Sequence, residues 1–213
     1  MQTDLDRSGR LSFLVIDEET RQVLREFRTI LAPQIDSVLE AFYRHVGANA
    51  QMARIFTTSA SQAHARAMQR QHWMDNVFSG EFNERYFEQV VKIGKAHERI
   101  GLEPRWYLAG YCFTLNRLVA LATQTYRKKP ERLAQIVSAI NKAVFLDMDL
   151  AISVYIDATR ETAARILNEH ASVFEKDIQG MVNIVASAAT ELESTSQSMS
   201  ATAEETSRQS TSV

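Results

Sequence analysis

The sequence predicts an all-α protein. Glycine and proline are scarce, with seven and three residues among 213, and no alternation of apolar and polar residues is long enough to propose a sheet. Apolar residues recur instead at intervals of three and four, which is the period of an amphipathic helix.

The prolines and one glycine mark where the expected helices begin and end. Pro33, Pro104 and Pro130 each open an apolar-periodic segment, as expected for the first turn of a helix. Gly101 ends the segment that precedes Pro104. We predict helices over residues 10–16, 18–31, 33–47, 60–79, 83–99 and 104–128, and a last one from Pro130 onward.

The composition changes after about Ala158, where aromatic residues nearly vanish and Ala, Ser, Thr and Glu take over. Beyond this point, mostly apolar residues recur in alternating steps of four and three, the heptad of a coiled coil. We therefore divide the chain into a globular domain, 1–158, and a linker with a coiled coil, 159–213. The predicted seam consists of Leu167, Ala171, Phe174, Ile178, Met181, Val185, Ala188, Leu192, Thr195 and Met199.

The last helix is too long to lie on one small domain. At 1.5 Å per residue, a helix from Pro130 to the end would measure about 120 Å. We expect it to project and to pair its apolar seam with a second copy, giving a homodimer. The alternative is a single amphipathic helix folded onto a core.

The overall composition excludes several classes of protein. A net charge of −2 and a pI near 6.2 favour neither nucleic acid nor anionic lipid. No stretch approaches the roughly 18 consecutive apolar residues of a membrane span. The first ten residues lack the apolar core of a secretory signal, so we expect a cytoplasmic protein. The single Cys112 cannot form an intramolecular disulfide and is predicted to be a buried structural thiol.

No motif of an enzyme is present. The sequence contains no GxGxxG, no phosphate-binding loop and no nucleophile with a partnered base, and we predict no catalytic activity.

One helix carries a candidate metal ligand. The residues Tyr86, Val90, Ile93, His97 and Ile100 share one face, on which His97 is the only strongly coordinating side chain. A histidine near the end of an apolar helix face, just before a tight turn, suits a proximal haem ligand, because iron needs a neutral nitrogen donor in a water-poor slot. The alternative is a core histidine satisfied by the protein itself.

Three segments resemble the globin-coupled sensors, a family of bacterial haem sensors. The run HERIGLEPRWY (97–107) resembles their proximal-histidine segment, and FYRHV (42–46) and HWMDNVFSG (72–80) also resemble that family at fitting distances. The resemblance covers most of the chain before Ala158. It implies a globin-like three-over-three helical sandwich with an extra N-terminal helix, which binds haem b through His97.

The resemblance also implies a distal group. Tyr43, which follows Phe42, resembles the distal tyrosine of the family. A phenol hydroxyl in a dry pocket can donate a hydrogen bond to bound oxygen, worth about 1 kcal/mol. The alternative is a core tyrosine bonded to a backbone carbonyl.

A second distal group is less well defined. Met68 and Gln69 fall where the distal helix of the family faces the haem, but many members carry leucine or threonine in this area. Gln69 could add a second donor, and Met68 is expected to pack. The further pocket residues that we expect are Phe56, Ile93, Ile100, Trp106, Tyr107, Tyr111 and Val144.

The other histidines are weaker candidates for ligands of the haem iron. His64 and His72 lie on the helix expected to cross the distal side, so each is a candidate sixth ligand that would close the sensing position. We expect His45 and His170 to face solvent.

The segment Ala186–Val213 resembles the start of the signalling coiled coil of methyl-accepting chemotaxis proteins. It implies an aerotaxis transducer that senses oxygen or another diatomic gas and acts on a histidine kinase through a coupling protein. We expect the chain to be a fragment without its output region. Glu204–Glu205 looks like the pair that the chemotaxis family methylates, although a plain solvent-facing pair also fits.

Three rival functions remain open at this point. The globin could regulate an enzymatic output such as a diguanylate cyclase, it could be a haem-free signalling scaffold, or it could be a gas-handling globin.

Overall fold

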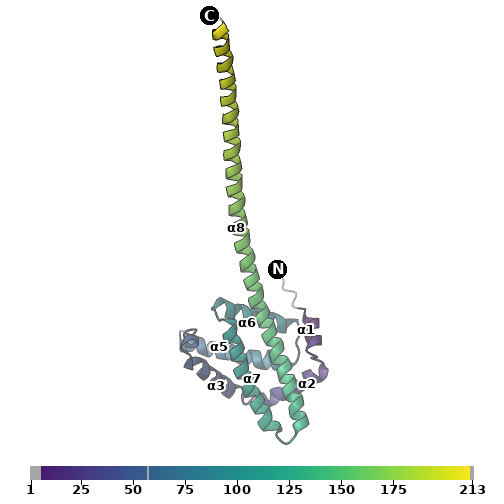
Figure 1. Ribbon diagram of the computed structural model, residues 1–213. Coiled ribbons are helices and arrows are strands. Elements are labelled where there is room, and N and C mark those ends of the chain that lie inside the picture. Colours follow the sequence, from purple (N-terminus) through teal and green to yellow (C-terminus); the bar gives the residue numbers. More distant parts are fainter. Residues whose placement is uncertain (1–5, 57, 212–213) are drawn as a thin grey trace. The chain divides into compact units, whose positions relative to one another are not determined.

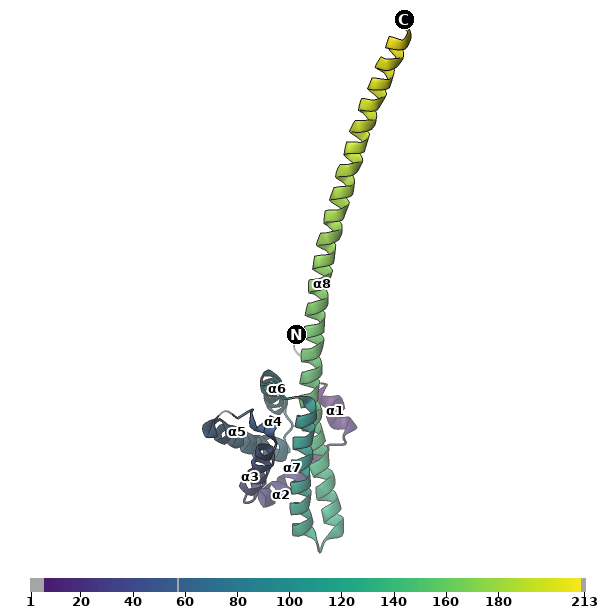
Figure 2. The same cartoon turned by 60° about the vertical axis from the view of Figure 1, so that its left-hand side comes forward.

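The computed structural model describes residues 6–56 and 58–211, and they form helices and connecting turns without a strand (Figures 1 and 2). The prediction of an all-α protein is confirmed. The elements are α1 (Arg7–Phe13), α2 (Glu18–Leu31), α3 (Ile35–Ala48), α4 (Ala50–Ala53), α5 (Ser59–Gln71), η1 (His72–Asn76), η2 (Val77–Ser79), α6 (Glu84–Arg99), α7 (Pro104–Tyr126) and α8 (Pro130–Thr211).

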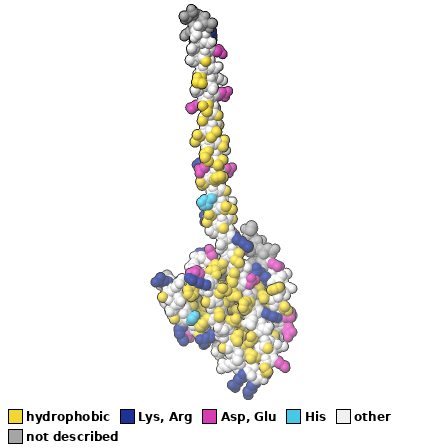
Figure 3. Space-filling view, in the orientation of Figure 1, with side chains coloured by type: hydrophobic (Ala, Val, Ile, Leu, Met, Phe, Trp, Pro, Cys, Tyr) yellow, Lys and Arg dark blue, Asp and Glu magenta, His cyan; other side chains and the backbone are white. Residues whose placement is uncertain are grey.

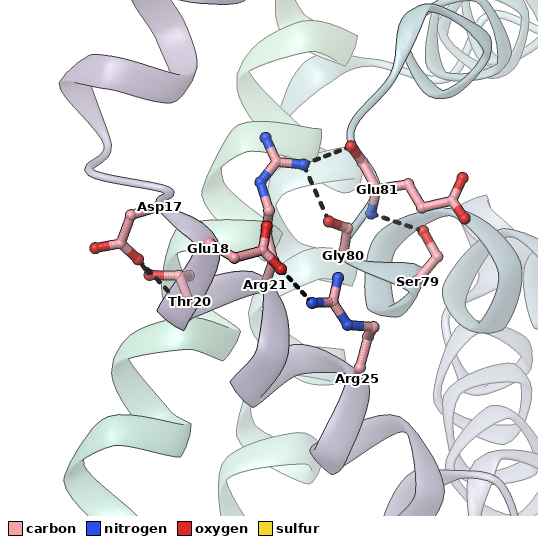
Figure 4. A network of polar contacts seen from close by, with 8 residues as sticks. All are labelled: Asp17, Glu18, Thr20, Arg21, Arg25, Ser79, Gly80 and Glu81. Atoms are coloured by element: carbon pink, nitrogen blue, oxygen red, sulfur yellow. Dashed lines mark hydrogen bonds and ion pairs between the residues drawn. The ribbon is translucent and has the colours of Figure 1, made fainter.

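Local sequence signals explain most helix starts. The Asp17 carboxylate accepts from the backbone N–H of Thr20 at 2.8 Å, and Asn83 caps α6 in the same way through Tyr86. Pro104 stands in the first turn of α7, as predicted. Figure 4 shows the Asp17 cap beside the contacts of Arg21, whose guanidinium donates to the carbonyls of Gly80 and Glu81.

Several predicted bounds were wrong, and one short helix was missed. The helix predicted over 10–16 lies at Arg7–Phe13. Pro33 lies in the turn before α3 rather than in its first turn. The single helix predicted over 60–79 ends as an α-helix at Gln71 and continues as the π-helical η1 and the 3₁₀ turn η2. The short α4, which the sequence analysis missed, begins at Asn49, whose side chain accepts from two backbone N–H groups.

The chain divides into two compact units, Met1–Ala158 and Thr159–Val213. In the first unit, α2, α3, the η segments, α6, α7 and the first part of α8 enclose an apolar core. Its largest fully buried side chains are Phe27, Phe78, Phe82, Leu24, Leu31, Ile35, Leu39, Leu118, Ile136, Ile140, Leu146 and Leu150.

The extra N-terminal helix α1 packs against the first part of α8. Leu11 and Leu14 contact the core. Arg10 pairs with the Asp149 carboxylate and donates to Ser153, and Lys142 donates to the carbonyl of Val15.

In the second unit, α8 continues as one helix whose described side chains are all exposed. The predicted seam residues Leu167, Phe174 and Leu192 are each 67–70% exposed. Hydrophobic side chains follow this part of the helix in Figure 3.

The prediction that Cys112 is buried was wrong, because its side chain is exposed. It follows the buried Tyr111 by one residue, and one step along a helix turns a side chain about 100° away from the buried face. Among the described residues, no helix has an apolar stretch long enough to cross a membrane.

Candidate functional site

His97 lies in the last turn of α6 with one ring nitrogen already engaged. Its Nδ1 is 2.9 Å from the carbonyl oxygen of Ile93, one turn earlier, so Nδ1 carries the proton and donates it. Burial lowers the pKa of His97 below its usual value, although the hydrogen bond to Ile93 acts in the opposite direction. The ring is therefore held neutral with its lone pair on Nε2, which is the form that ligates a metal.

The helix ends directly beyond His97. Gly101 adopts a left-handed φ of +71°, and the backbone N–H of Leu102 donates to the carbonyl of His97. The edge of the His97 ring meets Tyr107 in the first turns of α7, with ring centroids 5.0 Å apart. The turn thus fixes the imidazole against an aromatic side chain of the next helix.

Tyr43 lies on α3 in a small aromatic cluster. Its ring packs edge-on against Phe42 and Phe56, at centroid distances of 5.3 and 5.6 Å. Burial raises the pKa of the phenol to about 12, so the hydroxyl keeps its proton. The described residues provide no hydrogen-bond partner for this hydroxyl, which leaves it available as a donor.

A surface recess of about 330 Å³ adjoins Tyr43 between α3 and α5. Its other lining residues are Glu40, Arg44, Ser59, Gln62, Ala63 and Arg66. The side chains of Met68 and Gln69 do not line this recess.

The structure buries some of the other predicted pocket residues and exposes the rest. Tyr107, Tyr111 and Val144 are buried in the core, and Ile93 and Trp106 are half-buried. Met68 and Ile100 are 50% and 54% exposed, so neither lies in the core of the folded chain.

Buried polar atoms without a hydrogen-bond partner among the described residues include Oε1 of Gln69 and Nε1 of Trp106, both in predicted pocket residues, and Nε1 of Trp73, which was not predicted to line the pocket. Buried polar groups are normally hydrogen-bonded, so such exceptions call for an explanation. The open Nε2 of His97 is a metal ligand, and the open hydroxyl of Tyr43 and the unpaired atoms of Gln69 and Trp106 are polar groups of the kind that a haem and its bound gas would engage. The residues present therefore fit haem.

The two candidate sixth ligands are not equivalent in the structure. His64 is exposed on α5. His72 is buried, and both of its ring nitrogens are engaged, Nε2 with the Asp147 carboxylate at 2.8 Å and Nδ1 with the Asn76 amide at 3.3 Å. His72 was one of two candidate sixth ligands, and with both ring nitrogens engaged it offers no free lone pair to an iron.

Asp147 is the residue that the sequence analysis missed. It lies on α8 with no exposed surface, and it accepts from Tyr86 Oη at 2.8 Å, Tyr111 Oη at 2.5 Å and His72 Nε2 at 2.8 Å. Burial by itself would raise the pKa of this carboxyl. The charge and hydrogen bond of His72 and the two phenol donors outweigh burial, and the net pKa is lowered.

The signal for Asp147 was present in the sequence. An acidic residue interrupts the apolar face that includes Ile140, Val144, Ala151 and Val154, all of them buried. A carboxylate at such a position must find donors on neighbouring helices.

Comparisons with known proteins agree with this fold. A family model described as Protoglobin matches residues 4–161. The heme-based aerotactic transducer HemAT of Halobacterium salinarum is 26% identical over 157 residues, which cover 70% of this chain and 32% of that protein. The chain thus spans about a third of the length of this relative.

Solved structures show the same fold at low sequence identity. The globin domain of a Geobacter sulfurreducens globin-coupled sensor matches with a TM-score of 0.66 and 16% identity, over 70% of this chain and 96% of that one. The ferric globin domain of DosC from E. coli matches with a TM-score of 0.59 and 14% identity, over 68% and 99% of the two chains. The predicted globin-like fold is confirmed.

Proposed function

The chain belongs to the protoglobin family, and from this premise we propose that it senses oxygen through haem held by His97 and passes the signal along α8 to a chemotaxis output. Globin-coupled sensors and protoglobins bind haem. The single observation that carries the assignment of His97 is its ring geometry, with Nδ1 committed to Ile93 and Nε2 open.

When bound, the haem supplies an iron centre that takes up a diatomic gas. The protein side chains do the rest. His97 presents the Nε2 lone pair, Tyr43 holds a proton on its phenol oxygen and donates a hydrogen bond to the gas, and Gln69 offers a second polar group. The aromatic rings of Phe42 and Phe56 cover part of the Tyr43 ring and restrict its orientation.

An absorption spectrum of the purified protein tests this proposal. The reduced protein should show a sharp Soret band that shifts reversibly when oxygen is added, and His97→Ala should lose the band. His64→Ala is the matched control and should keep the Soret band, because that histidine is exposed and is not expected to bind the iron. A protein that stays folded but colourless after haem is supplied would contradict the assignment and leave the scaffold alternative.

The chemotaxis output forms the second part of the proposal. It is supported by the likeness to a protein described as an aerotactic transducer and by the chemoreceptor-like sequence of Ala186–Val213. In this proposal the role of the chain is sensing, not catalysis. Residues 1–213 joined to a chemoreceptor signalling domain, and reconstituted with a chemotaxis kinase and coupling protein, should change the rate of kinase phosphorylation on oxygen addition. Gas binding without any change in kinase activity would contradict the proposed chemotaxis output but not the proposed role in gas sensing.

A homodimer completes the proposal. Leu167, Phe174, Met181 and Val185 lie 53–69% exposed along α8 at heptad spacing, and apolar residues at this spacing stabilise paired helices. Light scattering at micromolar concentration should give about twice the chain mass of 24.1 kDa. A mass of one chain would contradict the dimer.

A further inference from the structure

Asp147 joins three separate elements of the first unit to α8. Tyr86 comes from α6, Tyr111 from α7 and His72 from η1, and each donates to the same buried carboxylate. We call these four side chains the Asp147 network.

Two of these connections lead to His97. Tyr86 lies on α6, the helix that carries His97 in its last turn. The second connection runs through α7, because the hydroxyl of Tyr107 is 3.1 Å from that of Tyr111, and the Tyr107 ring lies against the His97 ring at 5.0 Å. One route is thus the helix itself, and the other is a chain of rings and hydroxyls.

Close packing makes these routes mechanically stiff. Val154, two turns beyond Asp147 on α8, packs so closely against Gly94 of α6 that a Cβ on that glycine would lie 3.0 Å from its Cγ2. Packed interiors transmit displacement, since they have few voids in which to absorb it. At this contact α6 cannot approach α8 without displacing it.

The chemistry of the Asp147 network restricts how its hydrogen bonds can rearrange when a helix moves. A buried carboxylate that loses a donor keeps its charge without compensation, and the donor is also left unpaired. A shift of α6 or α7 therefore favours one of two outcomes: α8 follows, or the network exchanges partners as a unit. Elements with discrete alternative arrangements of this kind convert small displacements into a switch.

We propose that Asp147 is the positioning residue that couples the His97 helix to the signalling helix α8. The inference rests on the proposed function, since it assigns the step between gas binding at His97 and movement of α8. A network of this kind does not have to be retained for stability, because an apolar set of the same volume often stabilises a core as well.

Hydrogen exchange of the backbone amides in residues 140–158 tests the proposal on the haem-loaded protein. Exchange is compared between the reduced protein and the same protein with oxygen, and visible absorption confirms haem content and gas binding in each sample. In the wild type, oxygen should change the exchange rates in this stretch. Asp147→Asn and Tyr86→Phe should reduce that change about threefold or more while oxygen still binds.

Asp149→Asn is the matched control. It removes one carboxylate from the same helix, but its side chain is 52% exposed and pairs with Arg10 at the surface, so the oxygen-dependent change should persist. If Asp147→Asn fails to fold, Tyr86→Phe carries the test, since it removes a single hydroxyl. The proposal is overturned if the change survives in the foldable network variants, if Asp149→Asn abolishes it equally, or if the wild type shows none. A wild type that binds no haem would overturn the proposed function instead, and the coupling with it.

Discussion

Replacing Asp147 by alanine should cost the first unit much of its stability. The substitution leaves three buried donors without their acceptor: the hydroxyls of Tyr86 and Tyr111 and the Nε2–H of His72. An unpaired buried donor costs about 1–3 kcal/mol. The three costs do not simply add, because the donors belong to one network. We therefore expect a loss of about 4 kcal/mol from a free energy of unfolding that is typically about 5–15 kcal/mol.

The assay is urea unfolding followed by tryptophan fluorescence. Both tryptophans, Trp73 and Trp106, lie in the first unit, so the signal reports on that unit rather than on residues 159–211. Asp149→Ala is the control, since an exposed ion pair contributes about 0–1 kcal/mol. If the midpoint shifts while the slope of the unfolding free energy against urea concentration stays the same, stability alone has changed. If Asp147→Ala, at matched haem content, loses no more stability than Asp149→Ala, the argument from unpaired donors is wrong.

Three further outcomes are expected. Gly80→Ala should destabilise the protein more than Gly101→Ala does: both glycines have a φ of +71°, but only at Gly80 would a Cβ lie 2.7 Å from a backbone oxygen, that of Arg21 (Figure 4). Thermal unfolding should show a difference of about 1–3 kcal/mol, and equal losses would contradict the steric argument. Tyr43→Phe removes the distal donor, so stopped-flow oxygen dissociation should become about fivefold faster, whereas an unchanged rate would assign that phenol to packing. The pKa of Asp147 lies below its ordinary value of 3.8 in the folded protein, so its contribution to stability is present above pH 3.8 and is lost as the pH falls through the folded pKa. As the pH is lowered below about 4, the urea midpoint should consequently fall more steeply in the wild type than in Asp147→Asn. Equal slopes of the midpoint against pH in the two proteins would show that this carboxylate is not the cause.

The sequence determined which residues form helices, because helix formation depends on local pattern. The helix over 18–31 was predicted with the bounds that the structure shows, and those over 83–99 and 104–128 were predicted to within one or two residues. Capping side chains and a period near 3.6 act within a few residues of one another, so they can be recognised without tertiary structure. His97 was singled out as a candidate ligand from one face of one helix and the turn that ends it, together with the resemblance of residues 97–107 to the globin-coupled sensors.

The tertiary structure decided which side chains meet. His72, Tyr86 and Tyr111 are separated from Asp147 by 75, 61 and 36 residues, and nothing in the local pattern pairs them. The same applies to Cys112, which was predicted to be buried and is exposed, and to His72, a candidate iron ligand whose ring nitrogens are both engaged. Contacts of this kind depend on how far each helix is rotated about its own axis when it packs. That rotation is set by the whole core, since a turn of one residue changes the direction of a side chain by about 100°.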